Sequence, residues 1–331
     1  MEPLKCTDGT VFSEKGRLYT VSRNPGMRVY GERLLTISGT EYREWSPDRS
    51  KLSAYITCGG TAFPFTRSSH VLYLGAASGT TSSHVSDIVR NGKVYCVEFS
   101  PRSFRDLVKT AERRDNMNPI LGDATDPEEY GFLIDKVDIV YSDVAQKNQA
   151  DILANNMERF NARYGMVCIK ARSEDVTAEP KTVFEEARKR LLNRGCRILD
   201  MRSLEPYEGA HAIIVAERPR TVYCIVMKDD RFLMVHNLKR KGWEMPGGKV
   251  ENDETTEQAA VRECLEESGY EAALIDKKNI GYCDVCVCLL GKKISKGEME
   301  SELFETLPDN LAFDTDEYEN VIEWARCCIR Q

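Results

Sequence analysis

Short apolar runs alternate with stretches of helical periodicity along the first two thirds of the chain. Apolar residues recur at helical spacing in four segments, 83–92, 102–115, 149–165 and 179–195. The apolar runs around these segments are "HVLYLGAA", "KVYCVEF", "VDIVYSDV", "GMVCIKAR" and "AHAIIVAE". The last segment is expected to end at Gly195 and to present one apolar face, formed by Val183, Phe184, Ala187, Leu191 and Leu192. Strand–helix alternation of this length predicts an α/β fold with a doubly wound, mainly parallel sheet.

Different patterns precede and follow this alternation. Within residues 1–50, the runs "GRLYTVSR", "RLLTI" and "EYREW" predict a small antiparallel cap. After Pro219, "TVYCIVMKDDRFLMVHN" predicts a hairpin that turns at Lys228–Arg231. We therefore expect a β-rich subdomain at 1–55, an α/β domain at 56–219 and a further domain at 220–331.

Composition and charge support this division. The chain has 331 residues, of which 41% are hydrophobic and 30% charged, as in a soluble protein of two domains. Its longest apolar runs are too short to span a membrane, and "MEPLKCTDGT" lacks a signal pattern, so we expect a cytoplasmic protein. Residues 1–219 hold 31 basic and 30 acidic residues, whereas residues 220–331 hold 15 and 23. The net charge of −7 therefore belongs to the second part.

Twelve scattered cysteines are interpreted as reduced thiols, because nothing in the sequence indicates secretion. "CDVCVC" contains one CxxC pair, Cys283 and Cys286, and a zinc site would need a second, properly spaced pair. We interpret this run, which also includes Cys288, as alternating small residues on a half-buried strand.

Small residues and acids follow the predicted strands of the first part. Gly75, Ala76, Ala77 and Gly79 come directly after the first sheet strand and allow the backbone to approach a ligand. Glu98, Asp123 and Asp143 then follow three successive strands. The alternative is that these acids are solvated loop carboxylates. Because parallel strands end at one edge of a sheet, the spacing favours a cofactor site there.

These residues also carry a family resemblance. "RVYGERL", "EYREWSPDRSKL", "LYLGAASGTTSSHVSDIV", "VEFSPR", "ILGDATDPEEY", "DVAQ", "IKARS" and "LEPYEGAHA" occur in the order seen in archaeal fibrillarin. The chain resembles this family over residues of about 17 to 217. Fibrillarin is a Rossmann-like RNA 2′-O-methyltransferase that uses S-adenosylmethionine. The resemblance implies partners as well: a Nop-type scaffold protein, a kink-turn-binding protein and a box C/D guide RNA, with rRNA or tRNA as substrate.

The resemblance assigns roles to residues of this sequence. It implies a catalytic group of Lys51, Asp143, Lys170 and His211. Together with the glycine-containing turn, it implies cofactor contacts from Gly75, Ala76, Gly79, Thr80, Thr81, Glu98, Phe99, Asp123, Ala124, Asp143, Val144, Ala145 and Gln146. Considered alone, Lys51 would be interpreted as a surface charge and His211 as a packed histidine. Two departures from the family pattern are Lys147, where proline is expected, and the segment 57–70.

The second part contains an unusually acidic stretch between Gly247 and Tyr270. On a helix, Glu263, Glu266 and Glu267 share one face, and Arg262 is the only basic residue between Glu251 and Glu271. Clustered carboxylates repel one another unless a cation binds, and oxygen ligands favour Mg²⁺ or Mn²⁺. Behind them we expect core positions at Ala259, Ala260 and Leu265.

The spacing of this stretch resembles the Nudix box. The resemblance implies an α/β/α sandwich that hydrolyses a nucleoside diphosphate linked to another moiety. It implies metal ligands from Glu263, Glu266, Glu267 and the Gly247 carbonyl, with Arg262 orienting the glutamates and Glu254 helping through water. The general base is left open between Glu263 and a later acid, which would be Glu298, Glu300 or Glu302. Selectivity is expected from "HNLKRKGW" and from residues after the box.

Two alternatives stay open from the sequence. In one, the Nudix domain is a docking module without catalytic activity that holds a nucleotide, RNA or protein. In the other, the methyl acceptor is a small molecule or protein and not an RNA selected by a guide.

Overall fold

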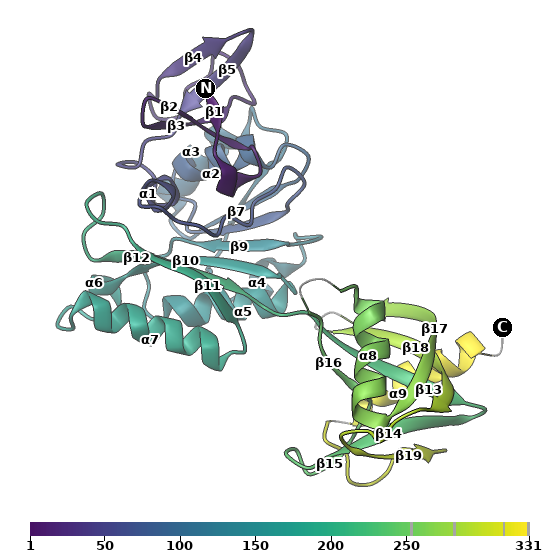
Figure 1. Ribbon diagram of the computed structural model, residues 1–331. Helices are drawn as coiled ribbons and strands as arrows, with labels where there is room; N and C mark the ends of the chain where they lie inside the picture. The colour runs from purple at the N-terminus through teal and green to yellow at the C-terminus, as the bar shows by residue number, and fades with distance from the viewer. Residues whose placement is uncertain (252–253, 281–282, 314, 330–331) are drawn as a thin grey trace. The chain divides into compact units, whose positions relative to one another are not determined.

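The computed structural model describes residues 1–251, 254–280, 283–313 and 315–329. The chain divides into two compact units, Met1–Arg218 and Pro219–Gln331. Figure 1 labels the elements of each unit, and the two units are described separately below.

A seven-stranded sheet forms the centre of the first unit, with strand order β11-β12-β10-β9-β6-β7-β8. Five strands are parallel: β6 (Val71–Leu74), β7 (Val94–Glu98), β8 (Met117–Leu121), β9 (Ile139–Ser142) and β10 (Tyr164–Lys170). The other two, β11 (Arg197–Ser203) and β12 (His211–Glu217), are antiparallel. The predicted mainly parallel sheet is confirmed, whereas β11 was not expected. Chain order reverses between β6 and β9, and this is where α/β sheets bind ligands.

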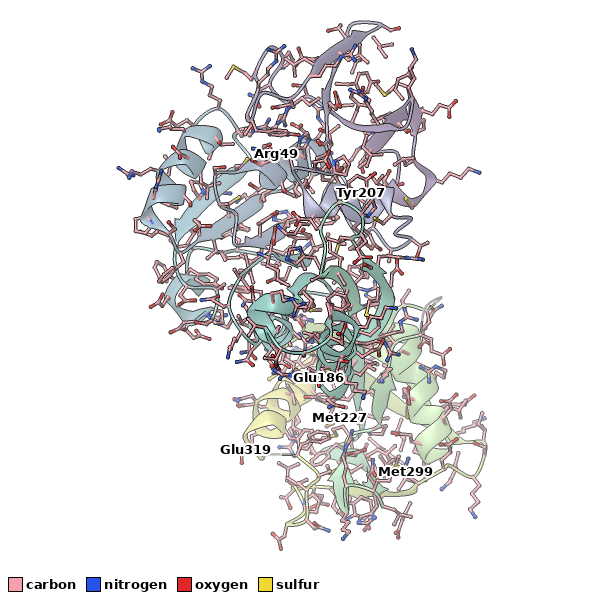
Figure 2. All side chains as sticks on the ribbon, turned by 90° about the vertical axis from the view of Figure 1, so that its left-hand side faces the viewer. Arg49, Glu186, Tyr207, Met227, Met299 and Glu319 are labelled. Carbon is pink, nitrogen blue, oxygen red and sulfur yellow. The ribbon has the colours of Figure 1, made fainter. Side chains whose placement is uncertain are left out.

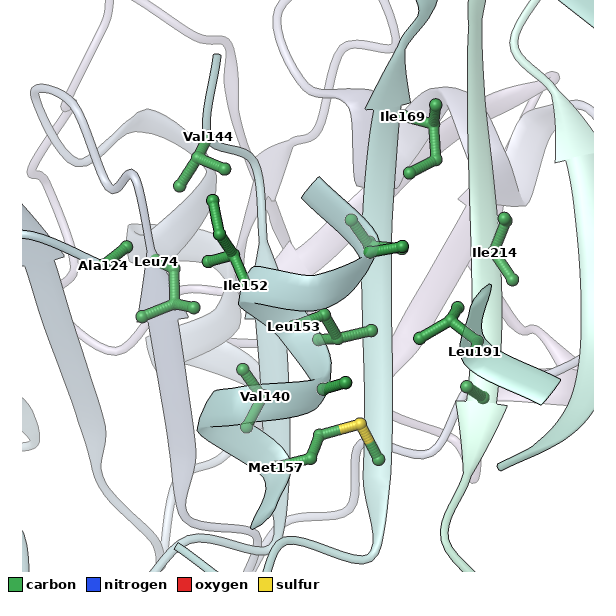
Figure 3. Close-up of a cluster of buried hydrophobic side chains, with 14 of the residues drawn as sticks. Leu74, Ala124, Val140, Val144, Ile152, Leu153, Met157, Ile169, Leu191 and Ile214 are labelled. Atoms are coloured by element: carbon green, nitrogen blue, oxygen red, sulfur yellow. The ribbon is translucent and has the colours of Figure 1, made fainter. Parts of the chain in front are cut away.

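Helices cover both faces of this sheet. On one face, Leu72 and Leu74 share a hydrophobic cluster with α5 (Gln149–Arg159) and α7 (Pro180–Asn193), as Figure 3 shows for α5. On the other face, Val71 and Tyr73 pack with α1 (Lys51–Thr57), α2 (Thr80–Ile88) and α3 (Pro101–Ala111). Shorter helices are η1 (Lys5–Thr7), α4 (Glu128–Gly131) and α6 (Ala171–Glu174).

The predicted apolar face of α7 needs one correction. Val183, Phe184, Ala187 and Leu191 are buried, but Leu192 is exposed. Successive residues of a helix differ by about 100° around the axis. Because Leu191 points into the core, Leu192 is rotated away from it.

A small antiparallel sheet precedes α1, as predicted. Its order is β1-β2-β3-β5-β4, from β1 (Glu2–Pro3), β2 (Val11–Glu14), β3 (Arg17–Val21), β4 (Leu34–Ile37) and β5 (Thr40–Glu44). Val11, Leu18 and Trp45 belong to the same hydrophobic cluster as Val71 of the large sheet. The cap therefore shares its core with the α/β sheet, within one compact unit.

The second unit is built on a mixed sheet. Its strands are β13 (Thr221–Lys228), β14 (Arg231–Asn237), β15 (Gly242–Glu244), β16 (Gly247–Lys249), β17 (Tyr270–Asn279), β18 (Asp284–Lys293) and β19 (Glu300–Phe304). The main order is β15-β14-β13-β18-β17, while β16 pairs with β13 and β19 with β14. The predicted hairpin at Lys228–Arg231 is confirmed.

The two long helices of this unit cover opposite faces of the sheet. Val222, Cys224 and Val226 of β13 pack with α8 (Thr256–Ser268), whereas the alternate residues of β13 pack with α9 (Thr315–Ile329). Figure 2 labels Met227 of β13 and Glu319 of α9. Residues on a strand alternate between its two faces, so the predicted α/β/α sandwich is confirmed.

Two expectations about buried positions in this unit were wrong. Ala259 and Ala260 lie in the core, but the third core position of α8 is Cys264, and Leu265 is only partly buried. Cys286 and Cys288 lie in the part of β18, residues 285–288, that is buried on both faces and not half-buried, because β18 is an interior strand of the sandwich. All twelve cysteines are free thiols. Within the described ranges, no helix has the length and apolarity needed to cross a membrane.

Candidate functional site

The turn after β6 forms one wall of the first candidate site. Gly75 has φ +76°, and a Cβ there would lie 3.0 Å from the backbone oxygen of Asp143, which follows β9. Gly79 has φ +95° and precedes α2; a Cβ there would lie 2.9 Å from Thr110 Cγ2. Side chains other than glycine are disfavoured at such φ values. Gly75 therefore allows this turn to approach the loop after β9 closely, and Gly79 allows it to approach Thr110 of α3.

The predicted strand-end acids connect the loops at this edge of the sheet. Glu98 accepts hydrogen bonds of 2.8 Å from the backbone N–H groups of Ala77 and Ser100. Asp123 Oδ1 accepts a bond of 3.2 Å from Gln146 Nε2 and one of 2.9 Å from the Thr125 N–H. The Thr125 N–H is the main reason that the pKa of Asp123 lies below its usual value. Glu98 thus links the loops after β6 and β7, and Asp123 links the loops after β8 and β9.

The other predicted cofactor residues differ in burial. Ala76, Ala124 and Val144 are buried. Thr81 is buried and donates a hydrogen bond of 3.0 Å to Ser50, the N-cap residue of α1. Thr80 is half-buried, Ala145 is exposed, and the Phe99 side chain is 68% exposed.

Two lysines share the carboxylate of Asp143. Lys51 Nζ, at the start of α1, lies 3.2 Å from Oδ2, and Lys170 Nζ, at the end of β10, lies 2.8 Å from Oδ1. Lys170 Nζ also donates a bond of 2.7 Å to the Asp143 backbone oxygen. Burial is the largest single influence on Lys51 and lowers its pKa, but the charge and hydrogen bond of Asp143, together with the charges of Cys168 and Glu208, raise the pKa overall. The structure therefore brings three of the four predicted catalytic side chains into one charged cluster.

His211 lies beside this cluster. It faces Lys170 in the antiparallel β10–β12 register, and its Nδ1 is 3.2 Å from Glu208 Oε2. Burial lowers the pKa of His211, and Lys51 and Lys170 lower it further, while Glu208 opposes them. The imidazole is therefore neutral at pH 7 and is available to accept a proton.

Sequence reasoning missed two residues that position this group. Glu208 contacts His211, as described above. Gln149 is buried, accepts a bond of 2.8 Å from the Lys170 N–H and donates one of 2.9 Å to the Gln146 carbonyl. The three-residue spacing of Glu208 and His211 was a usable signal, but the Gln149 contacts depend on tertiary packing.

The second candidate site lies around Arg262 of α8. Its guanidinium contacts Glu254 Oε1 at 2.6 Å, Glu263 Oε1 at 2.9 Å and Glu266 Oε2 at 3.0 Å. Glu267 accepts a bond of 2.9 Å from the Gly247 N–H. A Cβ at Gly248 would collide with the Glu263 carboxylate, so the β16 backbone lies directly against this acid. All predicted Nudix carboxylates on α8 therefore meet at the β16 edge of the sheet.

This cluster carries more negative than positive charge. Burial raises the pKa of Glu267, which is 7% exposed, to about 7, and the charges of Glu263, Glu244 and Glu298 contribute. Burial also raises the pKa of Glu263. An excess of partly buried carboxylates with oxygen donors fits a hard divalent cation.

The carboxylates predicted to bind the metal are not grouped around one point. Among the described residues, no group of three or more His, Cys, Asp or Glu side chains is placed to hold a metal ion. Arg262 holds Glu263 and Glu266, and the Gly247 N–H holds Glu267. The ligand set, including the Gly247 carbonyl, stays a prediction.

The candidate general bases lie at different places. The Glu298 N–H donates a bond of 2.9 Å to the Glu266 carbonyl, and the Met299 N–H one of 2.9 Å to the Glu267 carbonyl. Glu300 and Glu302 lie on β19 opposite His236 and Met234 of β14. The choice among these acids and Glu263 stays open.

Comparison with known protein families covers both units. The Fibrillarin family model matches residues 8–220. The chain belongs to the fibrillarin family. The NUDIX domain model matches residues 217–301, so the chain also carries a NUDIX domain.

Similar proteins are known for the fibrillarin part. The fibrillarin-like rRNA/tRNA 2′-O-methyltransferase of Methanopyrus kandleri is 50% identical over 224 residues, which are 66% of this chain and 97% of that protein. The structure of Aeropyrum pernix fibrillarin with natively bound S-adenosyl-L-methionine is similar at 46% identity and a TM-score of 0.56, covering 60% of this chain and 88% of that one. The structure of a fibrillarin/Nop5p complex is similar at 41% identity and a TM-score of 0.58, and the match covers 63% of this chain and 97% of that one.

The two departures from the fibrillarin pattern leave the charged cluster intact. Residues 58–70 form turns and loop after α1, where Tyr55 Oη and the Thr61 N–H each donate a bond of 2.8 Å to Asp200. Lys147 is exposed, and the neighbouring Gln146 still contacts Asp123. Figure 2 labels Arg49 and Tyr207, on the segments that lead to Lys51 and His211.

Proposed function

We propose that this fibrillarin-family chain transfers a methyl group from S-adenosylmethionine to a ribose 2′-hydroxyl of rRNA or tRNA. The observation that carries the proposal is the sharing of the Asp143 carboxylate by Lys51 and Lys170, at the point where Gly75 closely approaches the Asp143 backbone. The name of the Methanopyrus relative, which is 50% identical, supports the same reaction.

The residues of this cluster suit that reaction. When bound, S-adenosylmethionine supplies a methyl group that is already activated on a sulfonium. The hydroxyl oxygen must lose a proton as it forms the new bond to carbon and the carbon–sulfur bond breaks. Lys170 is positioned to stabilise the developing negative charge on oxygen, and Asp143 orients Lys170. His211 or Asp143 would accept the proton, and Lys51 would hold an RNA phosphate.

We further propose that the chain acts within a box C/D ribonucleoprotein. The complex of a 41% identical fibrillarin with Nop5p supports a Nop-type scaffold partner. Residues 1–219 are almost neutral in formal charge, so their RNA affinity would depend on such partners. A kink-turn-binding protein and a guide RNA would complete the assembly and select the substrate.

Methyl transfer from tritiated S-adenosylmethionine tests this function. Incorporation at the guide-selected ribose, dependent on scaffold and guide, is expected. Transfer to a small molecule or protein without the guide would contradict it and support the alternative acceptor.

We also propose that the NUDIX domain is a Mg²⁺-dependent pyrophosphohydrolase. Glu263, Glu266, Glu267 and the Gly247 carbonyl would hold the cation, which when bound neutralises phosphate charge and activates water. Arg262 orients Glu263 and Glu266 and links them to Glu254. The excess of partly buried carboxylates supports this function over a docking module, because docking does not need them.

A panel of nucleoside diphosphate compounds tests this activity. Monophosphate or pyrophosphate release that requires Mg²⁺ and is lost in Glu266→Gln is expected. Full activity of Glu266→Gln would contradict the ligand assignment, and no turnover with any compound would support the docking alternative.

A further inference from the structure

A pocket of about 270 Å³ adjoins the acidic cluster of the NUDIX domain. Gly247 and Gly248 line it, and these are the residues that contact Glu267 and Glu263 on α8. No carboxylate of α8 is among the lining residues, but the β16 backbone at Gly247 and Gly248 connects the pocket to Glu267 and Glu263. A ligand whose one end occupies the pocket would present its other end to α8.

One wall of the pocket offers a flat stacking surface. Phe313 lines the pocket and is 43% exposed, which is unusual for a large aromatic ring. The Arg240 guanidinium lies 4.8 Å from the centroid of that ring. Tyr318 contacts Phe313 edge-on, with centroids 6.5 Å apart, and Tyr223 contacts Tyr318 in the same way at 6.0 Å. Exposed aromatic rings and guanidinium planes are surfaces on which nucleobases stack.

The polar side of the pocket is formed by the buried Glu244 carboxylate and the Arg240 guanidinium. Glu244 is only 3% exposed and lines the pocket. Its Oε1 accepts a bond of 2.7 Å from Asn237 Nδ2, and its Oε2 one of 2.7 Å from Arg240. Each carboxylate oxygen has two acceptor positions, so each has capacity for one more donor. The Glu244 carboxylate thus offers two adjacent acceptor oxygens beside the N–H donors of Arg240.

Only one common base matches that pattern fully. Guanine has two adjacent donors, N1–H and the N2 amino group, next to the O6 acceptor. Adenine, cytosine and uracil each offer a single donor position on the corresponding edge. The Glu244 carboxylate would accept hydrogen bonds from both guanine donors, and Arg240 would donate to O6. With any other base, at least one of these buried polar groups would have no hydrogen-bond partner, so the other bases would be rejected.

We propose that this pocket binds the guanine base of a guanine nucleotide, whose 5′-phosphates then pass over Gly247 and Gly248 to α8. The volume suits a single nucleoside, so any second moiety would lie outside the pocket. The inference rests on the proposed hydrolase function and names its substrate class as guanosine 5′-diphosphate compounds.

Binding of nucleoside monophosphates to the full chain tests the pocket without any hydrolysis. Calorimetry without Mg²⁺ is expected to show guanosine monophosphate binding at least tenfold more tightly than adenosine, cytidine or uridine monophosphate. Phe313→Ala is expected to weaken guanosine monophosphate binding at least tenfold. Phe132→Ala, an exposed phenylalanine of the fibrillarin unit, is the matched control and leaves binding unchanged. Equal affinity for the four nucleotides, no binding, or wild-type binding by Phe313→Ala would overturn the proposal.

A second variant tests base selection. Glu244→Gln keeps the size of the side chain but replaces one acceptor with a donor, so the preference for guanine is expected to disappear. Circular dichroism monitors folding, because Glu244 is buried; if the variant unfolds, the Phe313→Ala result decides. If guanosine monophosphate binds but no compound is hydrolysed, the hydrolase function is contradicted and the guanine pocket is not. If only adenine compounds are hydrolysed, the guanine pocket is contradicted and the hydrolase function is not.

Discussion

The two candidate sites are opposite in charge. Around Asp143, two ammonium groups share one carboxylate, whereas around Arg262 one guanidinium contacts three carboxylates and a fourth, Glu267, lies nearby on the same helix face. The first site has a surplus of positive charge and the second a surplus of negative charge. The first surplus suits the proposed oxyanion and RNA phosphate, and the second suits the proposed cation.

The sites also differ in how their charged groups are connected. Lys51 and Lys170 each contact the same carboxylate, that of Asp143. In the NUDIX domain, Glu263 and Glu266 contact Arg262, whereas Glu267 contacts the Gly247 N–H. The first site is thus centred on one carboxylate, and the acids of the second are divided between a side chain and the backbone.

Removing Lys170 should have the largest effect. Lys170→Met is expected to reduce methyl transfer about 10²–10³-fold, because one donor to the developing oxyanion is lost. Binding of S-adenosylmethionine, measured by calorimetry, should not change. Lys93→Met, at an exposed lysine paired with Asp135, serves as the control. A loss of less than threefold would show that the positive surplus is not catalytic.

The raised pKa of Glu267 predicts a pH dependence of stability. An acid with a folded pKa of about 7, against 4.5 when unfolded, binds more protons in the folded state between these values. The metal-free NUDIX domain should lose about 3 kcal/mol of unfolding free energy as the pH rises from 4.5 to above 7. Urea denaturation in EDTA measures this loss.

Glu267→Gln is the control for that prediction. It removes the titrating group, so the variant should be more stable than the wild type at pH 8 and show a flatter profile. If wild type and variant had parallel pH profiles, Glu267 would not carry a raised pKa.

The role of Arg262 should appear as a smaller loss. Arg262→Gln is expected to reduce Mg²⁺-dependent hydrolysis about 10–100-fold, the usual effect of removing a group that orients metal ligands. Arg326→Gln, at an arginine of α9 whose guanidinium donates a bond of 2.9 Å to the Glu305 carbonyl, is the comparison. Equal rates for both variants would contradict an orienting role for Arg262.

The smallest effect is expected at Glu208. Glu208→Gln removes a negative charge that stabilises the His211 imidazolium, so the pKa of His211 should fall further. The chain has four histidines, and NMR titration of their rings resolves the change. His84 is buried, and burial together with Arg43 and Arg114 lowers its pKa, so it should not respond. An unchanged or raised pKa of His211 would rule out the Glu208 contact.

The sequence predicted the strand-end acids well because a parallel sheet brings all its carboxyl ends to one edge. It predicted the carboxylate face of α8 because helical spacing fixes which residues share a side. It could not predict Gln149, whose contacts with Lys170 and Gln146 depend on how α5 packs. The Arg43–Asp87 ion pair of 2.6 Å joins the cap to α2 over 44 residues, and no local pattern reveals such a pair.

The central claim is that one chain carries two separate catalytic sites. The most direct test measures methyl transfer and Mg²⁺-dependent nucleotide hydrolysis side by side in the assembled complex, for the wild type, Lys170→Met and Glu266→Gln. We expect the wild type to perform both reactions, Lys170→Met to lose only methyl transfer, and Glu266→Gln to lose only hydrolysis. Hydrolysis that survives in Glu266→Gln, or that is absent from the wild type while methyl transfer proceeds, would contradict it.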